Sequence, residues 1–115
     1  MQLWHLPWAI IKHEELTLKL YNVIWRHKFV EKIADKHGVT ADEVEEILFS
    51  CHHFRLVEKG QVKGENLYVA YGQTTSGRYL VVFFVRKRQA AALPISARDM
   101  SPSERRYYNE QTKAR

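Results

Sequence analysis

The longest apolar run in the chain extends from Leu80 to Val85 and contains no polar position. A strand that is apolar on both faces belongs inside a sheet, where both faces are covered. Apolar and aromatic residues also dominate positions 67–71 and much of 91–98, and QTTSG at 73–77 has the composition of a turn. The pattern predicts three consecutive strands between Leu67 and Arg98, with the middle strand central.

Two helices are predicted ahead of these strands. Residues 27–37 place Phe29, Val30, Ile33 and Ala34 on one helix face, and Gly38 follows as a left-handed cap. Residues 40–43, TADE, form a capping box that starts a second helix, with an apolar face at Val44, Ile47, Leu48 and Cys51. Together they predict an αα-hairpin over residues 28–50.

The remaining segments complete the predicted fold. Alternation predicts strands at Thr17–Trp25 and Phe54–Glu58, and the capping box from Ser101 to Glu104 predicts a terminal helix from Pro102 onward. Residues 1–16 are interpreted as an N-terminal extension of a single domain spanning 1–115. The predicted fold class is α+β, with a central antiparallel sheet, the αα-hairpin and the C-terminal helix.

Composition limits the class of protein. At 115 residues with 45% hydrophobic and 27% charged residues, the chain is typical of a soluble globular domain. No apolar run approaches the ~20 residues that a membrane helix needs. The lone Cys51 excludes an internal disulfide and, with no basic segment before the first apolar residues, predicts a cytoplasmic protein.

Charge is distributed unevenly along the chain. Up to Gly72 there are 9 basic and 10 acidic side chains, whereas from Gln73 onward there are 9 basic and 3 acidic ones. This asymmetry favours a basic surface that faces phosphates or an acidic protein partner. Arginines at the ends of the predicted strands suggest an anion site; they are Arg78, Arg86, Arg88 and Arg98.

Motifs for cofactor or metal chemistry are missing from the sequence. Cys51, His52 and His53 are consecutive, so they cannot all point at one ion from regular structure, and no metal site is predicted. GxGxxG, P-loop and GxSxG motifs do not occur, and no cofactor is predicted. His37 stands at a predicted helix end, where it is either a C-terminal cap or a group that titrates near neutral pH.

Three segments carry a resemblance to a known family: IADKHGVTADEVEEIL, LYVAYGQTTSGRYLVVFFVRKR and ISARDMSPSERRYY. In this order they resemble the BrnT family, toxins of type II toxin-antitoxin modules that belong to the RelE-like ribonucleases. The likeness covers about Leu20 to Gln111. Leu93 departs from it, because the family often has a basic residue at that place.

The resemblance implies a metal-independent endoribonuclease that is restrained by a cognate antitoxin, with operator DNA reached only through the antitoxin. RNA supplies its own 2′-hydroxyl nucleophile, so arginines that orient and neutralise the phosphate supply much of the catalysis. Arg78, Arg86 and Arg98 are the candidates for that role. Candidates for proton transfer are His37, Glu104 and Tyr108, and candidates for further substrate contacts are Lys36, Arg88, Ser96 and Arg105.

Each assignment has a structural alternative. In the structural alternatives, Glu104 serves only as the capping-box residue, Arg98 pairs with Glu104 or Asp99, and Tyr108 packs on the sheet. The competing function is a non-catalytic interaction module whose basic surface binds an acidic protein or nucleic acid. Convergence of the arginines with a proton-transfer group in one site would favour the enzyme.

Overall fold

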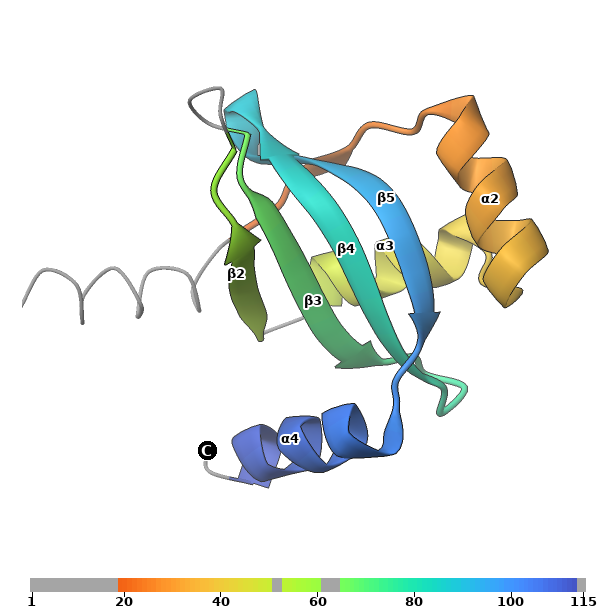
Figure 1. Cartoon of the computed structure of the whole chain (residues 1–115), viewed down its shortest axis with the longest axis vertical. Helices are drawn as coiled ribbons and strands as arrows, with labels where there is room; N and C mark the ends of the chain where they lie inside the picture. Colours follow the sequence, from red (N-terminus) through yellow and green to blue (C-terminus); the bar gives the residue numbers. More distant parts are fainter. Residues whose placement is uncertain (1–18, 51–52, 61–64, 114–115) are drawn as a thin grey trace, which may run out of the picture.

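One mixed β-sheet and the helices packed on it make up the fold. The computed structural model describes residues 19–50, 53–60 and 65–113, and it is α+β (Figure 1). The strands are β1 (Asn22–Val23), β2 (Phe54–Glu58), β3 (Leu67–Gln73), β4 (Tyr79–Lys87) and β5 (Ala91–Asp99), in the spatial order β1-β5-β4-β3-β2. The α-helices of the described residues are α2 (His27–His37), α3 (Ala41–Ser50) and α4 (Pro102–Lys113), and a short 3-10 turn, η2 (Arg88–Ala90), joins β4 to β5.

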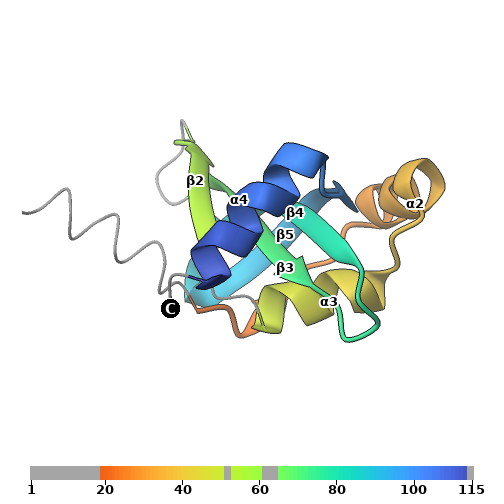
Figure 2. The same cartoon turned by 90° about the horizontal axis from the view of Figure 1, so that it is seen from below.

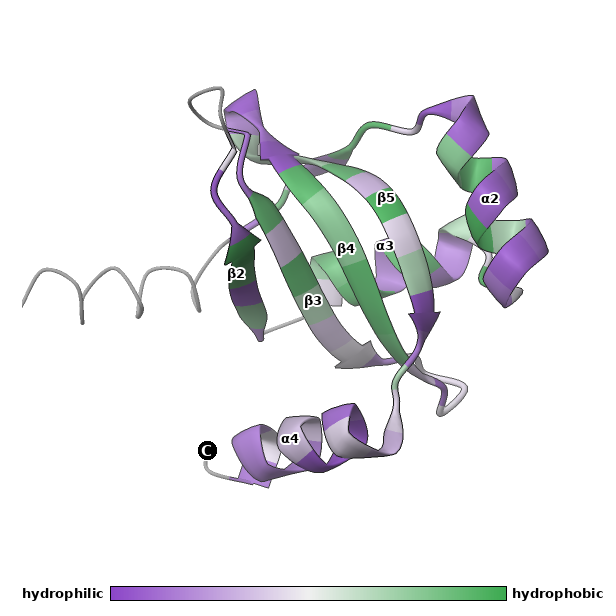
Figure 3. Cartoon of the chain, viewed as in Figure 1, coloured by the Kyte–Doolittle hydropathy of each residue, from purple (hydrophilic) through white to green (hydrophobic). Residues whose placement is uncertain are grey.

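The central position predicted for the apolar run is confirmed. β4 pairs antiparallel with β3 on one side and with β5 on the other. Helix α3 lies against one face of the sheet, and α4 crosses one end of the opposite face (Figure 2). Hydropathy follows this arrangement, because β3 and β4 are apolar along their middle whereas the surfaces of α2 and α4 are mainly polar (Figure 3).

The prediction of an antiparallel sheet is wrong at one edge. β1 pairs parallel with β5, through Asn22 with Ala91 and Val23 with Ala92. β1 is also much shorter than the strand predicted for Thr17–Trp25, of which residues 17 and 18 lie outside the described residues. Beyond β1 the Trp25 indole donates to Glu45 of α3 at 2.7 Å, and α2 begins two residues later.

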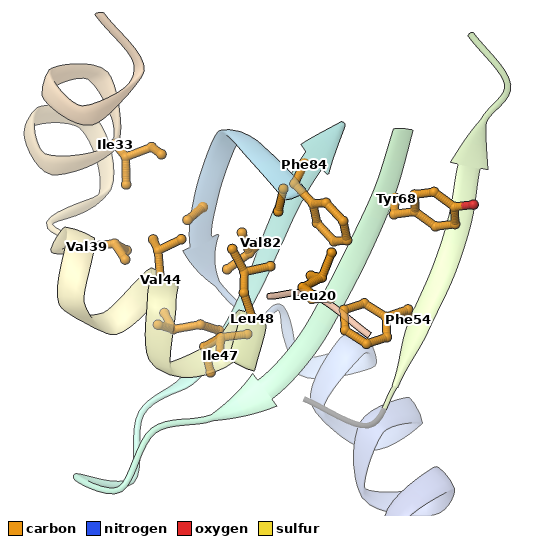
Figure 4. Close-up of a cluster of buried hydrophobic side chains, with 14 residues drawn as sticks. Leu20, Ile33, Val39, Val44, Ile47, Leu48, Phe54, Tyr68, Val82 and Phe84 are labelled. Carbon is orange, nitrogen blue, oxygen red and sulfur yellow. The ribbon is translucent and has the colours of Figure 1, made fainter. Parts of the chain in front are cut away.

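The main hydrophobic core lies between the sheet and the two helices α2 and α3. Figure 4 shows Ile33 of α2, Ile47 of α3 and Phe84 of β4 converging in it. Val39 and Val44, at the junction of the helices, are both buried in the same core. A second, smaller cluster on the other face joins Val69, Tyr71, Val81 and Met100, with Tyr107 and Tyr108 of α4 packed against it.

Local signals at the helix ends operate as the sequence predicts. Gly38 adopts φ 63° and its N–H donates to the carbonyl of Ala34, which ends α2. Thr40 and Glu43 exchange side-chain and backbone hydrogen bonds, as do Ser101 and Glu104, so both capping boxes are confirmed. The αα-hairpin and the RelE-like topology stay predictions.

Two predictions fall on parts of the chain without a structural description. The N-terminal extension, residues 1–16, and Cys51 lie outside the described residues. Within the ranges that are described, no helix is both long and apolar enough to cross a membrane.

Candidate active site

Two rows of side chains run across the α4 face of the sheet. In the first row, Tyr71 of β3 pairs with Val81 of β4, which pairs with Arg98 of β5. In the second row, Arg55 of β2 pairs with Val69, which pairs with Phe83, and Phe83 with Ser96. Because alternate residues of a strand share a face, the two rows lie beside each other on one surface.

His53 extends the first row beyond Tyr71. The Tyr71 N–H donates to the His53 carbonyl at 3.1 Å, which places His53 across from Tyr71 at the start of β2. The His53 side chain is buried, and its ring centroid lies 5.5 Å from that of Tyr71. Arg55, two residues along β2, is exposed, and its Nη1 donates to the Tyr71 hydroxyl at 3.5 Å. The edge of the sheet therefore contributes an imidazole and a guanidinium to this surface.

Helix α4 adds a phenol to the same place. The Tyr107 hydroxyl lies 2.7 Å from His53 Nε2, and the Tyr107 ring centroid lies 5.3 Å from that of Tyr71. The Arg55 guanidinium sits over the Tyr107 ring, 5.0 Å from its centroid. Burial raises the pKa of Tyr107, while the charge of Arg55 opposes that shift. Tyr107 is thus a protonated phenol at neutral pH, between an imidazole and a guanidinium.

Arg98 and Glu104 connect this surface to the first turn of α4. Arg98 Nη1 and Nη2 donate to the two carboxylate oxygens of Glu104 at 2.7 and 2.9 Å. The hydrogen bond from Arg98 is the main reason that the pKa of Glu104 falls from 4.5 to about 2, and the bonds from Ser101 lower it further. Such a weak base is poorly suited to proton transfer at neutral pH, and Glu104 caps the helix instead. Arg98 also lies over the Phe83 ring at 5.7 Å.

Arg78 lies elsewhere, in a network that joins the helices to the sheet. Its guanidinium donates to Asp99, to Glu43 and to the carbonyls of His37 and Gly38. All five of its N–H donors are used by these contacts. The His37 side chain is half-buried and Lys36 is exposed beside it. The structure therefore gives Arg78 a structural role, and phosphate binding by Arg78 or Lys36 and proton transfer by His37 stay predictions.

Arg86 and Arg88 lie at the far end of β4. Arg86 is five residues from Val81, roughly 17 Å along a strand, and alternation places it on the α2 and α3 face. Its Nε is buried and makes no hydrogen bond with the part of the chain that the structure describes. Arg88 is exposed in η2. The three arginines predicted to bind phosphate, Arg78, Arg86 and Arg98, do not converge. Of these three, only Arg98 lies on the same face of the sheet as Tyr71 and Tyr107.

Arg105 and Tyr108 gather around Tyr79 near the start of β4. The Arg105 guanidinium lies 4.1 Å from the Tyr79 ring centroid, and the Tyr108 ring packs edge-on at 6.0 Å. Arg105 also borders a shallow depression of about 460 Å³ beside Met100 and Pro102. Ser96 shares a row with Phe83 and so lies with Arg98 on the α4 face. Their substrate roles stay predictions.

Comparison with known families accounts for most of the chain. Residues 25–104 match the family model described as "Ribonuclease toxin, BrnT, of type II toxin-antitoxin system". The chain belongs to the BrnT family. Comparison with curated proteins found no match. His53, Tyr71 and Arg98 lie inside the segment that matches the BrnT model, whereas Tyr107 lies three residues beyond its end.

Sequence reasoning missed four residues that this BrnT chain brings together: His53, Arg55, Tyr71 and Tyr107. A signal for two of them was present, because His53 directly precedes the predicted strand Phe54–Glu58 and is two residues from Arg55, the spacing of residues that share a strand face. The sequence pattern relates His53 only to its neighbours Cys51 and His52, a group for which no metal site is predicted. Among the residues that the structure describes, no group of three or more His, Cys, Asp or Glu could hold a metal ion.

Proposed function

We propose that this BrnT-family chain is an endoribonuclease that cleaves RNA without a metal ion, on the α4 face of its sheet. The observation that carries the proposal is the placement of Arg55 and Arg98 on either side of Tyr71, in adjacent rows of one face. Arg55 donates to the Tyr71 hydroxyl, and Arg98 lies in the same row as Tyr71, one strand beyond Val81. Tyr71 itself is buried, and the two guanidinium groups are the parts of this arrangement that a phosphodiester could reach.

The reaction uses the nucleophile that RNA carries. The 2′-oxygen attacks the adjacent phosphorus, the bond to the 5′-oxygen breaks, and the products are a 2′,3′-cyclic phosphate and a 5′-hydroxyl. The protein must hold the phosphate in line and neutralise the charge on its equatorial oxygens. Arg98 is half-exposed at 36% of its side chain, and Arg55 is exposed, so both guanidinium groups face solvent.

Aromatic side chains beside the arginines suit unpaired bases. Phe83 is half-buried in the row next to Tyr71, and Tyr79 and Tyr108 follow toward the start of β4. Single-stranded RNA is commonly bound by stacking of its bases on such rings, with arginines along the backbone. Helix α4 covers Tyr71 and Val81, so we expect single-stranded RNA to lie on the part of this face that stays partly open, beside Phe83 and Ser96.

A protein antitoxin follows from membership in a type II toxin-antitoxin family. We propose that it is acidic and that it covers the segment from Gln73 onward, where basic residues outnumber acidic ones by 9 to 3. Contact with operator DNA would then run through the antitoxin. Recovery of the chain from its native host as a free monomer would contradict this part of the proposal.

A non-catalytic interaction module is the second candidate, and one observation favours it. Arg98 donates to both carboxylate oxygens of Glu104. The guanidinium is therefore already paired within the protein and would have to give up this ion pair to bind a phosphate. In that case the basic surface would bind nucleic acid or an acidic protein without cleaving it.

One assay separates the two candidates. Purified protein is incubated with single-stranded RNA, with and without EDTA, beside an RNA of the same sequence with 2′-deoxyribose at the cleaved position. The proposal expects cleavage that EDTA leaves unchanged, a cyclic phosphate end, and no cleavage at the deoxy position. Binding without cleavage would support the interaction module, and cleavage abolished by EDTA would contradict the metal-independent reaction.

A further inference from the structure

A buried histidine and a half-buried tyrosine form a pair that the family match does not explain. His53 and Tyr107 meet at 2.7 Å between the edge of the sheet and α4, fifty-four positions apart in the sequence. His53 is only 7% exposed, so its imidazole does not itself meet a large substrate. Its Nε2 is directed at the phenolic oxygen, which links the buried ring to the α4 face.

We propose that Tyr107 and His53 act as a proton relay for RNA cleavage, with Tyr107 at the reacting 2′-hydroxyl and His53 behind it. The inference rests on the proposed ribonuclease function and adds to it the group that moves the proton. Tyr107 would be the catalytic residue, because it touches the reacting atom. His53 would be a positioning residue that acts through Tyr107.

The surroundings of the pair fit this role. Among the described residues, ionisable groups reach His53 and Tyr107 from β2 with Arg55, from β3 with Tyr71 and from α4 with Tyr107 itself. Arg55 carries positive charge over the Tyr107 ring, where it can draw a phosphate toward the phenol. Burial raises the pKa of Tyr107, so the phenol is protonated at neutral pH and its proton is available to the hydrogen bond with His53 Nε2.

The proton balance is as follows. The 2′-hydroxyl loses its proton to the Tyr107 oxygen while the Tyr107 proton moves to His53 Nε2, which leaves an imidazolium. The 2′-oxygen forms its bond to phosphorus, and the bond from phosphorus to the 5′-oxygen breaks. The leaving oxygen takes a proton from water, and the resulting hydroxide is neutralised by the imidazolium proton. The relay therefore returns to its starting state without a metal ion or cofactor.

Other nearby groups fit the task less well. Glu104 is held as a carboxylate by Arg98, with its pKa at about 2. Tyr108 packs edge-on against Tyr79. His37 stands at the end of α2, where its backbone carbonyl accepts a hydrogen bond from Arg78. General acid and base groups work best when they are within hydrogen-bond reach of each other and titrate near the working pH, as an imidazole does.

The test compares two variants with matched controls. Tyr107→Phe removes only the hydroxyl, and Tyr68→Phe makes the same change at a tyrosine buried on the opposite face. His53→Gln removes the imidazole, and His27→Gln makes the same change at an exposed histidine of α2. Single-turnover cleavage rates are measured against pH on an RNA that the unmodified protein cleaves. Affinity is measured with a 2′-O-methyl RNA of the same sequence, and thermal unfolding is recorded for each variant.

Tyr107→Phe is expected to lower the cleavage rate by about 100-fold to 10,000-fold while affinity for the methylated RNA changes by no more than about threefold. His53→Gln is expected to slow cleavage and to abolish the fall in rate at low pH that protonation of an imidazole causes. The controls should match the unmodified protein. Unchanged cleavage by Tyr107→Phe, or an unchanged pH profile in folded His53→Gln, would overturn the relay.

Failure of the relay and failure of the proposed function give different results. If the unmodified protein cleaves RNA and the Tyr107→Phe variant cleaves it equally well, only the relay is wrong. If the unmodified protein binds RNA and never cleaves it, the ribonuclease proposal and the relay are both wrong. If His53→Gln unfolds, Tyr107→Phe decides alone, because its side chain is half-buried and its ring is retained.

Discussion

The Arg78 guanidinium and the Asp99 carboxylate lie side by side, with Nε donating to Oδ1 at 2.8 Å and Nη2 to Oδ2 at 3.3 Å. The same guanidinium reaches Glu43 and two backbone carbonyls at the end of α2. One side chain therefore ties the turn between α2 and α3 to the ends of β4 and β5. These contacts are structural, and phosphate binding by Arg78 stays a prediction.

Arg78→Ala is expected to lower the free energy of unfolding by about 2 kcal/mol, because Glu43 and two carbonyls lose a charged donor. Arg78→Lys should recover only part of this loss, since an ammonium cannot reproduce the planar set of five donors. Arg88→Ala, at an exposed arginine, is the control and should stay within about 0.5 kcal/mol of the unmodified protein. Urea unfolding measures all three. A stable Arg78→Ala protein that has lost RNA cleavage would contradict the structural role and favour phosphate binding.

Glu104 gives the protein an acid-sensitive contact. Its folded pKa of about 2 is below its usual 4.5, so it adds stability that is complete above about pH 5 and is lost as the pH falls toward 2. The full effect is about 3 kcal/mol. Glu104→Gln should lower the free energy of unfolding at pH 7. It should also make the free energies of unfolding at pH 7 and pH 3 more alike than they are in the unmodified protein.

Thermal unfolding at the two pH values checks the prediction for Glu104. Glu110→Gln, at an exposed position of the same helix, is the matched control. Asp99 also has a lowered pKa and keeps its own acid dependence in every variant, so the difference between the two glutamine variants isolates Glu104. Equal pH dependence in both would contradict the prediction.

Arg55→Ala is expected to weaken binding of single-stranded RNA about tenfold or more and to reduce the slope of log affinity against log salt by about 0.7, because one phosphate contact is lost. Stability should hardly change, since Arg55 is exposed. Arg26→Ala removes an equally exposed arginine that precedes α2 and should leave RNA binding unchanged. Fluorescence anisotropy across a salt series measures both. Equal losses in the two variants would show general charge attraction rather than a site.

Gly38→Ala is expected to cost about 1 to 2 kcal/mol of stability, because its φ of 63° is unfavourable for a residue with a Cβ. Apart from the two neighbours of Gly38 in the chain, no heavy atom of the described residues lies within 4 Å of the place where that Cβ would stand, so the cost comes from the backbone. Gly38→Asn should cost less, since asparagine tolerates this conformation better. Equal stability of the alanine variant in thermal unfolding would contradict the assignment.

Local patterns made much of the fold predictable. The end of one helix is predicted by Gly38, and the start of the next is predicted by the capping box at Thr40–Glu43. The apolar run at Leu80–Val85 was enough to place β4 in the middle of the sheet. The parallel pairing of Val23 with Ala92 could not be predicted in this way, because nothing local relates two segments about seventy residues apart.

The candidate site was less predictable for the same reason. Arg98 and Glu104 are six residues apart, and their pairing was among the alternatives that the sequence offered. His53 and Tyr107 meet only after the sheet has formed and α4 has folded across it. Arg78 and Arg86 look equivalent to Arg98 in the sequence. In the structure, however, Arg78 donates all its N–H groups to protein acceptors, and Arg86 lies on the opposite face of the sheet.

Helix α4 contributes no fully buried residue, although its entire length, Pro102–Lys113, is described. A segment that buries so little apolar surface detaches at a lower free energy than the sheet beneath it. Undocking of this one helix would separate Tyr107 from His53 and Glu104 from Arg98. If the proposed relay operates, a partner that binds α4 alone would therefore stop the reaction without unfolding the rest of the protein.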